Sequence, residues 1–139
     1  MNAILVGYGL AGRVFHAPLL RAAHFEIAAI VVNNPERRAQ AALDHPDAIL
    51  CTCLTEALHQ SDAALGVLAS PTDTHASFSI QSLQAGRHVV VDKPVALSAS
   101  ELRTMMDTAA TAEKLLIPFQ NRRWDADFLT LKDLIAHNK

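Results

Sequence analysis

The sequence predicts an α/β fold in which one doubly wound parallel sheet lies between two layers of helices, as a single three-layer αβα domain. Strand-length apolar runs alternate with helix-like segments along the 139 residues, and several runs are continuously apolar, as suits strands covered on both faces. A glycine-rich turn follows the first run, where a strand passes into a helix. The length suits one domain with a substantial core.

The order of elements follows from these runs and from residues typical of helix ends. Strands are expected over residues 1–6, 26–32, 48–52, 63–69, 89–91 and 115–119. Helices are expected after the glycines and over residues 35–43, 54–59, 74–85, 99–113 and 125–137. Asn34 and Ser98 are cap residues, and Gly86 suits a helix end. Pro18 should kink or restart the first helix near His16, because proline removes a helical hydrogen bond.

The connections predict the strand order. Right-handed crossovers between parallel strands give the order 3-2-1-4-5-6, which is the Rossmann arrangement. In such sheets a ligand lies beyond the carboxyl ends of the strands. The residues that directly follow each strand are therefore the candidates for a functional site.

Composition argues against several classes of function. Half of the residues are hydrophobic, 19% are charged and the net charge is −2, so a nucleic-acid partner is not expected. No apolar run has membrane-spanning length and no basic leader precedes the first strand, so we expect a cytoplasmic protein without a membrane partner.

Cys51 and Cys53 are expected on one face of a strand, without a disulfide or a role. No histidine pair has metal-ligand spacing, so no metal site is expected.

The first strand leads into the turn Gly7-Tyr8-Gly9-Leu10-Ala11-Gly12, which has the G-x-G-x-x-G spacing of dinucleotide-binding turns. The first glycine permits the tight turn, the second lets phosphates approach bare backbone, and the third lets helix and strand pack closely. Backbone amides at this turn can face a pyrophosphate. Methyltransferases carry related loops, so the turn needs its context to identify the ligand.

Polar residues follow three further strands. They are Ala69, Ser70, Pro71, Thr72 and His75 after the fourth strand, Asp92 and Lys93 after the fifth, and Asn121, Arg122 and Trp124 after the sixth. Because the carboxyl ends of parallel strands meet at one edge of a sheet, these groups should converge there with the glycines. The sequence therefore predicts a dinucleotide site built from four strand ends.

With these motifs the chain resembles the nucleotide-binding domain of the Gfo/Idh/MocA oxidoreductases over nearly its whole length. The resemblance rests on the glycine turn continued by His16-Ala17-Pro18, the Ser70-Pro71-Thr72 to His75 loop, Asp92-Lys93-Pro94, and the Asn-Arg-Arg-Trp segment at 121–124. It implies a nicotinamide-dependent oxidoreductase that transfers a hydride to or from a sugar, polyol or related hydroxyl compound. It also suggests a cis bond between Lys93 and Pro94.

The resemblance further implies how the reaction is divided over the chain. Lys93 would lie between nicotinamide and substrate, where an ammonium polarises a carbonyl and stabilises negative charge on its oxygen, with Asp92 orienting it. Family members carry a catalytic histidine in a second domain. Residues 1–124 are therefore expected to form the dinucleotide domain, and residues 125–139 to begin a crossover helix toward a missing C-terminal domain.

Two consequences follow from that division of the chain. Catalysis by these 139 residues alone is not expected, because the proton-transfer group and most of the substrate pocket would be absent. Apolar side chains of the last helix would be left exposed, which should promote self-association. These side chains are Phe128, Leu131, Leu134 and Ile135.

The end of the second strand bears on the choice between NADP and NAD. The common NAD pattern has an acid about 20 residues after the last glycine, and no acid lies at this strand end. Asn33 and Asn34 follow the strand, and Arg37 and Arg38 lie one helical turn later. Amide donors, a helix N-terminus and arginines suit a 2′-phosphate, so NADP is preferred over NAD. The alternative is that Asn34 only caps its helix and both arginines are solvated.

The sequence leaves further alternatives open. His16 either faces the cofactor or packs within the domain, and His75 either contributes to the site or only lies in the first turn of its helix. The chain is either the cofactor domain of an oxidoreductase or a non-catalytic dinucleotide-binding module. A methyltransferase is a third class, but it has no evident use for Asp92-Lys93-Pro94.

Overall fold

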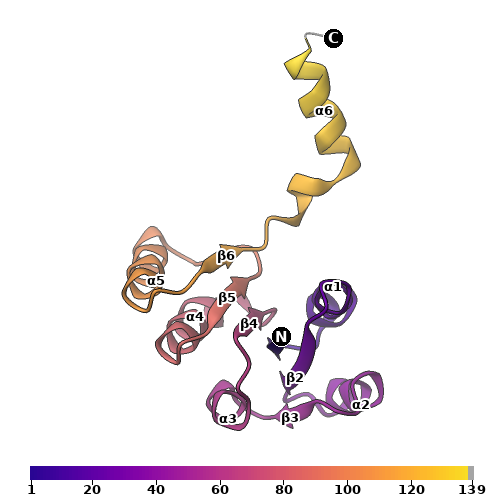
Figure 1. The fold of residues 1–139 in the computed structure, drawn as a ribbon, viewed down its shortest axis with the longest axis vertical. Helices are drawn as coiled ribbons and strands as arrows, with labels where there is room; N and C mark the ends of the chain where they lie inside the picture. Colours follow the sequence, from indigo (N-terminus) through magenta and orange to yellow (C-terminus); the bar gives the residue numbers. More distant parts are fainter. Residues whose placement is uncertain (138–139) are drawn as a thin grey trace.

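The computed structural model describes residues 1–137 and contains a six-stranded parallel sheet with helices on both faces (Figure 1). The strands are β1 (Asn2–Val6), β2 (Glu26–Val31), β3 (Ile49–Cys51), β4 (Leu65–Leu68), β5 (His88–Val91) and β6 (Leu116–Pro118). The α-helices are α1 (Ala17–Ala22), α2 (Pro35–Asp44), α3 (Leu54–Gln60), α4 (His75–Gln84), α5 (Ala99–Thr111) and α6 (Ala126–Ala136). Short helical segments η1 (Ala11–His16), η2 (Thr72–Thr74) and η3 (Asn121–Trp124) precede α1, α4 and α6.

The strand order is β3-β2-β1-β4-β5-β6, with every pair parallel, which confirms the order expected from the crossovers. In the centre of the sheet, Leu5 of β1 pairs with Ile30 of β2 on one side and with Val67 of β4 on the other. All six carboxyl ends therefore lie at the same edge.

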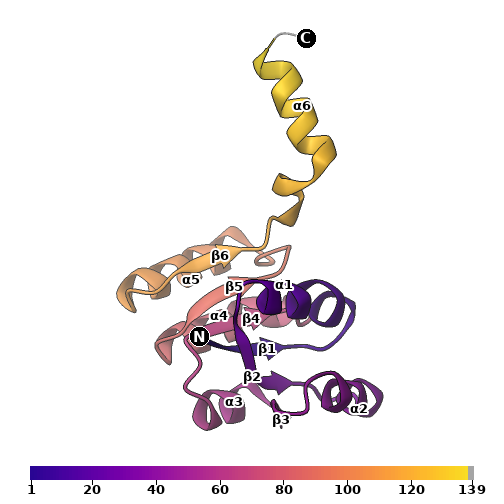
Figure 2. The same ribbon diagram turned by 45° about the vertical axis from the view of Figure 1, so that its right-hand side comes forward.

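The side chains of β1 alternate between two cores. Helices α1 and α2 cover one face of the sheet, and α3, α4 and α5 cover the other (Figures 1 and 2). Ile4 and Val6 pack with the α3, α4 and α5 side, whereas Ala3 and Leu5 pack with α1 and α2. This period of two is the geometry of a strand that is buried on both faces.

The helix boundaries follow the capping residues of the sequence. The Asn34 side-chain oxygen accepts a hydrogen bond from the Arg37 amide at 2.9 Å, and the Ser98 hydroxyl oxygen accepts one from the Glu101 amide at 3.1 Å. The first helix is irregular, as expected: η1 is a wide π-type segment through His16, and regular helix begins at Ala17. The Lys93-Pro94 bond is cis, as the resemblance suggested.

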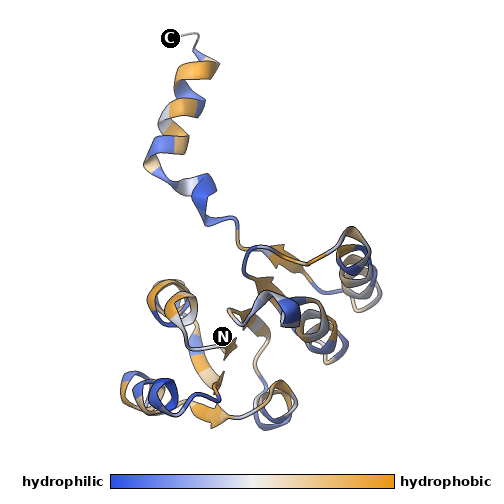
Figure 3. Cartoon of the chain, turned by 180° about the vertical axis from the view of Figure 1, so that it is seen from behind, coloured by the Kyte–Doolittle hydropathy of each residue, from blue (hydrophilic) through white to orange (hydrophobic). Residues whose placement is uncertain are grey.

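Among residues 1–137, no helix covers β5 and β6 on the sheet face where α1 and α2 lie (Figure 1). There, on the α1 side, lies an apolar groove of about 630 Å³, lined by Val67, Val90 and Ile117 of the sheet, Leu19 of α1 and Trp124 of η3. Helix α6 extends away from the sheet with all of its side chains exposed (Figure 1). Apolar turns run along it (Figure 3).

The expectation that both cysteines share one strand face was wrong. Strand β3 ends at Cys51, which is buried in the core, and Cys53 lies beyond it at the start of α3, where it is exposed. The chain turns into α3 directly after the strand, so the alternation of a strand no longer applies. No disulfide joins the two thiols.

Within residues 1–137, no helix combines the length and hydrophobicity needed to cross a membrane. The same residues contain no group of three or more side chains arranged to hold a metal ion.

Candidate functional site

The three glycines of the first turn differ in what surrounds them. Gly7 has φ +95°, and a Cβ there would lie 2.5 Å from the carbonyl oxygen of Ala69. A Cβ on Gly12 would overlap the carbonyl oxygen of Gly7. A Cβ on Gly9 would meet only the guanidinium of Arg37, with Nη1 at 3.4 Å. The fold itself requires Gly7 and Gly12, whereas Gly9 leaves its backbone open to a ligand.

A cleft of about 430 Å³ lies at the carboxyl ends of four neighbouring strands. Its lining includes Gly7, Tyr8, Asn33, Asn34, Arg37, Thr52, Cys53, Ser70 and Pro71. The residues come from the ends of β1, β2, β3 and β4, so the sheet brings the glycine turn together with three other strand ends. An elongated ligand can therefore cross the edge of the sheet beside exposed backbone amides.

The two arginines of α2 have different environments. Arg37 is exposed, lies over Gly9 and lines the cleft. The Arg38 guanidinium instead donates to the backbone: Nη2 lies 2.8 Å from the carbonyl oxygen of Leu50, and Nη1 lies 3.4 Å from those of Val32 and Cys51. Arg38 ties α2 to the sheet, and Arg37 is the cation left facing the cleft.

Tyr8 contributes backbone to the glycine turn, but its side chain is buried in the core beneath α1 and α2. Its hydroxyl donates a hydrogen bond to Asp44 Oδ2 at 2.8 Å. Burial is the main reason that the pKa of Tyr8 rises to about 12, and the Asp44 carboxylate adds to the effect. The phenol is therefore a neutral donor at any physiological pH.

His75 is fully buried and links two loops of the site. Its Nδ1 lies 2.8 Å from the carbonyl oxygen of Pro94, and its Nε2 lies 2.9 Å from that of Ser70. These carbonyls belong to the segments after β5 and β4. The ring therefore links the two segments and holds their relative position. The buried His75 side chain does not itself line the cleft.

His16 and Asp92 meet beside β6. His16 is buried, its ring centroid lies 4.3 Å from that of Phe119, and its Nε2 is 3.6 Å from Asp92 Oδ2. Desolvation lowers the pKa of His16, and the Asp92 carboxylate opposes this effect. The two side chains come from separate motifs, and the fold places them at the same edge.

Asp92 contacts the main chain of Lys93. Its Oδ1 accepts a hydrogen bond from the Lys93 amide at 2.7 Å, so the carboxylate fixes the backbone at the end of β5, and its role in orienting the ammonium stays a prediction. The Lys93 side chain is exposed. Its ammonium is thus free to meet a molecule beyond the strand ends.

The residues after β6 lie apart from the cleft. Asn121 and Trp124 line the apolar groove, and Trp124 is 77% exposed. The Arg122 guanidinium pairs with Asp125 at 2.5 Å, which raises the pKa of Arg122. Ala69 and Thr72 flank the Ser70 and Pro71 backbone without lining the cleft.

Sequence reasoning did not identify several residues around the cleft. Thr52 and Cys53 follow β3, and the rule that ligands lie beyond strand ends could have found them. Arg13 lies beside the glycine turn in a second, shallower cavity with Arg37, and its place directly after Gly12 was the available signal.

Comparisons with known proteins agree with this geometry. The model of the oxidoreductase family GFO_IDH_MocA, described as "Oxidoreductase family, NAD-binding Rossmann fold", matches residues 1–119. The uncharacterized oxidoreductase YdgJ of Escherichia coli is 37% identical over 132 residues, which cover 95% of this chain and 38% of that protein. The scyllo-inositol 2-dehydrogenase (NADP(+)) IolW of Bacillus subtilis is 37% identical over 95% of this chain and 36% of its own length.

Solved structures show the same fold. An NAD-binding protein from Listeria innocua superposes with a TM-score of 0.92 at 32% identity, covering 99% of this chain and 40% of that one. The WlbA dehydrogenase from Bordetella pertussis, in complex with NADH and UDP-GlcNAcA, superposes with a TM-score of 0.87 at 28% identity, covering 99% of this chain and 40% of that one. The chain thus spans about two fifths of these relatives.

Proposed function

The chain belongs to the Gfo/Idh/MocA family of oxidoreductases, and we propose that it binds NADPH for hydride transfer to or from a sugar, polyol or related hydroxyl compound. The observation that carries this proposal is the bare backbone of Gly9. The fold does not need a glycine there, and a pyrophosphate does, because its oxygens must reach the amides of the turn. The cleft that begins beside Gly7 and Tyr8 and crosses four strand ends fits a dinucleotide.

The preference for NADPH rests on Arg37. Arg37 lies in the first turn of α2, which follows β2, and its guanidinium lies over Gly9. A 2′-phosphate at this position would accept hydrogen bonds from the guanidinium. Arg38 is engaged with backbone carbonyls, so the phosphate-binding role that we had expected of both arginines narrows to Arg37. The name of IolW states NADP(+), which agrees with this preference.

Lys93 is the residue that we assign to the chemistry. When bound, the nicotinamide donates or accepts the hydride. The Lys93 ammonium would hold the oxygen of the reacting carbon and stabilise negative charge on it. Asp92 fixes the Lys93 backbone, and His75 holds the segment after β5 against the one after β4. These contacts fix the backbone from which the Lys93 side chain extends at the edge of the sheet.

We further propose that residues 1–124 are the dinucleotide domain and that residues 125–139 lead toward a separate substrate domain, in a cytoplasmic enzyme. The exposed apolar side chains of α6 and the groove beside Trp124 support this division, since both are surfaces that a further domain would bury. A second candidate function is a non-catalytic dinucleotide-binding module. It is favoured by the exposed Lys93, whose ammonium forms no ion pair among residues 1–137.

The test is a titration of the chain with NADPH and with NADH, followed by energy transfer from Trp124, the only tryptophan. Wild type should bind NADPH saturably and more tightly than NADH. Gly9→Val should lose both, with an unchanged circular dichroism spectrum. Binding of neither by wild type would overturn the proposal, and displacement of NADPH by S-adenosylmethionine would favour a methyltransferase. Turnover of a polyol by the chain would exclude the binding module, whereas dinucleotide binding is expected of both candidates.

A further inference from the structure

A second cavity, of about 360 Å³, adjoins the cofactor cleft on the outer side of the glycine turn. It shares Tyr8 and Arg37 with the cleft, and Arg13, Glu36 and Gln40 complete its polar lining. A ligand in the cleft that carries a branch beside Arg37 would place that branch here. The cavity is therefore the natural place for a group that distinguishes one dinucleotide from another.

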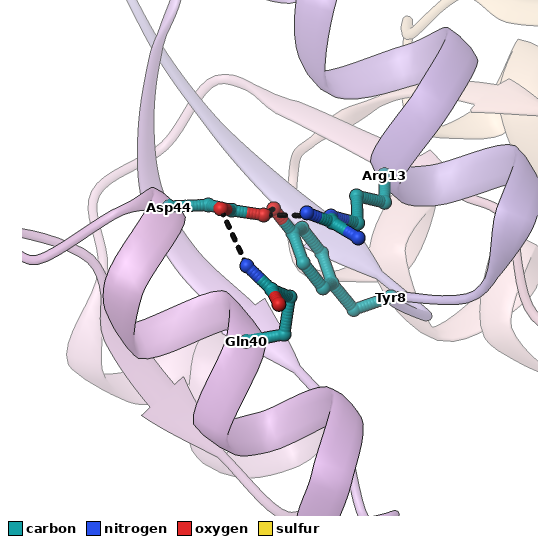
Figure 4. Close-up of polar contacts among 4 residues, drawn as sticks. All are labelled: Tyr8, Arg13, Gln40 and Asp44. Carbon is teal, nitrogen blue, oxygen red and sulfur yellow. Dashed lines mark hydrogen bonds and ion pairs between the residues drawn. The ribbon is translucent and has the colours of Figure 1, made fainter.

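Arg13 is held at this cavity by a hydrogen bond to the carboxylate of Asp44. Asp44, the last residue of α2, accepts hydrogen bonds from three side chains: from Tyr8 and from Arg13 Nε through Oδ2, each at 2.8 Å, and from Gln40 through Oδ1 at 2.7 Å (Figure 4). The donors come from the glycine turn, η1 and α2. Figure 4 shows the guanidinium and the phenol meeting at the same carboxylate oxygen.

The contact with Asp44 uses only part of the Arg13 guanidinium. Its Nε is engaged, while no hydrogen bond within residues 1–137 uses its two terminal nitrogens, and the side chain is 49% exposed. Hydrogen bonds from Tyr8, Arg13 and Gln40 lower the pKa of Asp44, so the carboxylate stays ionised at neutral pH. Asp44 thus fixes the direction of the guanidinium and leaves two parallel N–H groups for an anion.

We propose that Arg13 is a specificity-determining residue that binds the 2′-phosphate of NADPH together with Arg37, and that Asp44 and Tyr8 hold it in place. This inference rests on the proposed function. Two guanidinium groups from different elements then approach the phosphate, one from η1 and one from α2. A planar guanidinium can donate two parallel hydrogen bonds to one phosphate, and a lysine ammonium lacks this fixed geometry.

The charges of the cavity set how strong this preference can be. Arg13 and Arg37 face one carboxylate there, Glu36, and Asp44 offsets part of the Arg13 charge from behind. The selectivity therefore depends on oriented donors as well as on net charge. Removing the Glu36 charge should strengthen phosphate binding, because it leaves the donors in place and relieves repulsion.

The experiment compares Arg13→Met with Arg21→Met, which removes the same charge from α1 outside this cavity. The ligands are NADPH, NADH, adenosine 2′,5′-bisphosphate and 5′-AMP. We expect Arg13→Met to weaken NADPH and the bisphosphate about tenfold, with NADH and 5′-AMP within twofold of wild type. Arg21→Met should change none of the four by more than twofold. Glu36→Gln should tighten NADPH about twofold, and Arg13→Lys should recover only part of the loss.

Each other outcome has a definite reading. Equal weakening of NADPH and NADH by Arg13→Met would overturn the inference and assign Arg13 a structural role, as would no change in either. A wild type that binds NADH alone would overturn the inference and leave a nicotinamide-dependent oxidoreductase. A wild type that binds neither dinucleotide would overturn the proposed function and the inference together. Thermal unfolding of each variant identifies a loss caused by misfolding.

Discussion

The carboxyl edge of the sheet has two regions whose polar groups are held differently. At the ends of β1 to β4, which we call the nucleotide region, Arg38 bonds to backbone carbonyls of the strand ends and Tyr8 bonds to Asp44 of α2, so groups beside the cleft are held within the domain. At the ends of β5 and β6, which we call the reaction region, Lys93 is exposed and the neighbouring groove is apolar and open. The difference teaches that contacts within the domain position the polar groups of the nucleotide region, whereas the Lys93 side chain of the reaction region is left exposed.

The largest expected effect is on the free energy of unfolding. It distinguishes a glycine of the nucleotide region that the fold needs from one that the ligand needs. Gly12→Ala should destabilise the fold by about 3 kcal/mol, because the new Cβ overlaps the Gly7 carbonyl. Gly9→Ala should cost less than about 1 kcal/mol, since only the flexible end of Arg37 is near. Urea denaturation followed by circular dichroism measures both. Similar losses in the two variants would mean that Gly9 also serves the fold.

The next effect distinguishes the two arginines of α2. Arg37→Met should weaken NADPH about tenfold and leave NADH and stability nearly unchanged, because its guanidinium faces the cleft. Arg38→Met should instead lower the free energy of unfolding by about 1 kcal/mol, because it removes hydrogen bonds to backbone carbonyls. Calorimetric titration and urea denaturation of both variants measure this contrast. The assignment fails if Arg38→Met is the variant that loses selectivity.

In the reaction region, His16 should make stability depend on pH. Burial lowers its pKa below the ordinary 6.5, so the unfolded chain takes up a proton first as the pH falls. The free energy of unfolding should therefore decrease as the pH falls below about 6.5. His16→Gln should reduce this dependence, and His59→Gln, at an exposed position on α3, should keep it. Urea midpoints at pH 7.5 and 5.5 measure it.

The exposed apolar side chains of α6 should matter for association and little for stability. Phe128 and Leu131 are 46% and 56% exposed, and α6 leaves the sheet without covering it. The double variant Phe128→Glu and Leu131→Glu should reduce self-association and shift the thermal midpoint by less than about 2 °C. Light scattering against concentration measures this. A wild type that stays monomeric at high concentration contradicts the prediction.

The smallest effect is expected at Lys93, and it sharpens the difference between the two regions. Lys93→Met should change NADPH affinity by less than about twofold, because the exposed Lys93 does not line the cleft proposed for the dinucleotide. The NADPH titration used above measures it. A tenfold loss would place Lys93 within the cofactor site and would remove the distinction between nucleotide and reaction regions.

Local patterns in the sequence determined much of this protein. The continuously apolar strands, the caps at Asn34 and Ser98, and the break near Pro18 each depend on neighbouring residues, so the elements and the strand order could be predicted. The G-x-G-x-x-G spacing also predicted where the glycine turn lies. Chain connectivity alone then brought the strand ends to one edge, because parallel strands with right-handed crossovers have few arrangements.

Only the tertiary structure decided what each polar side chain does. Arg37 and Arg38 are identical neighbours in sequence, and one faces the cleft while the other bonds to β3. Asp44 gathers Tyr8 and Arg13 from positions 36 and 31 residues away. Side-chain partners depend on directions set by the packing of α2 against the glycine turn, and no local pattern encodes such long-range directions. The sequence therefore determined where a site would lie, and the packing selected the residues that form it.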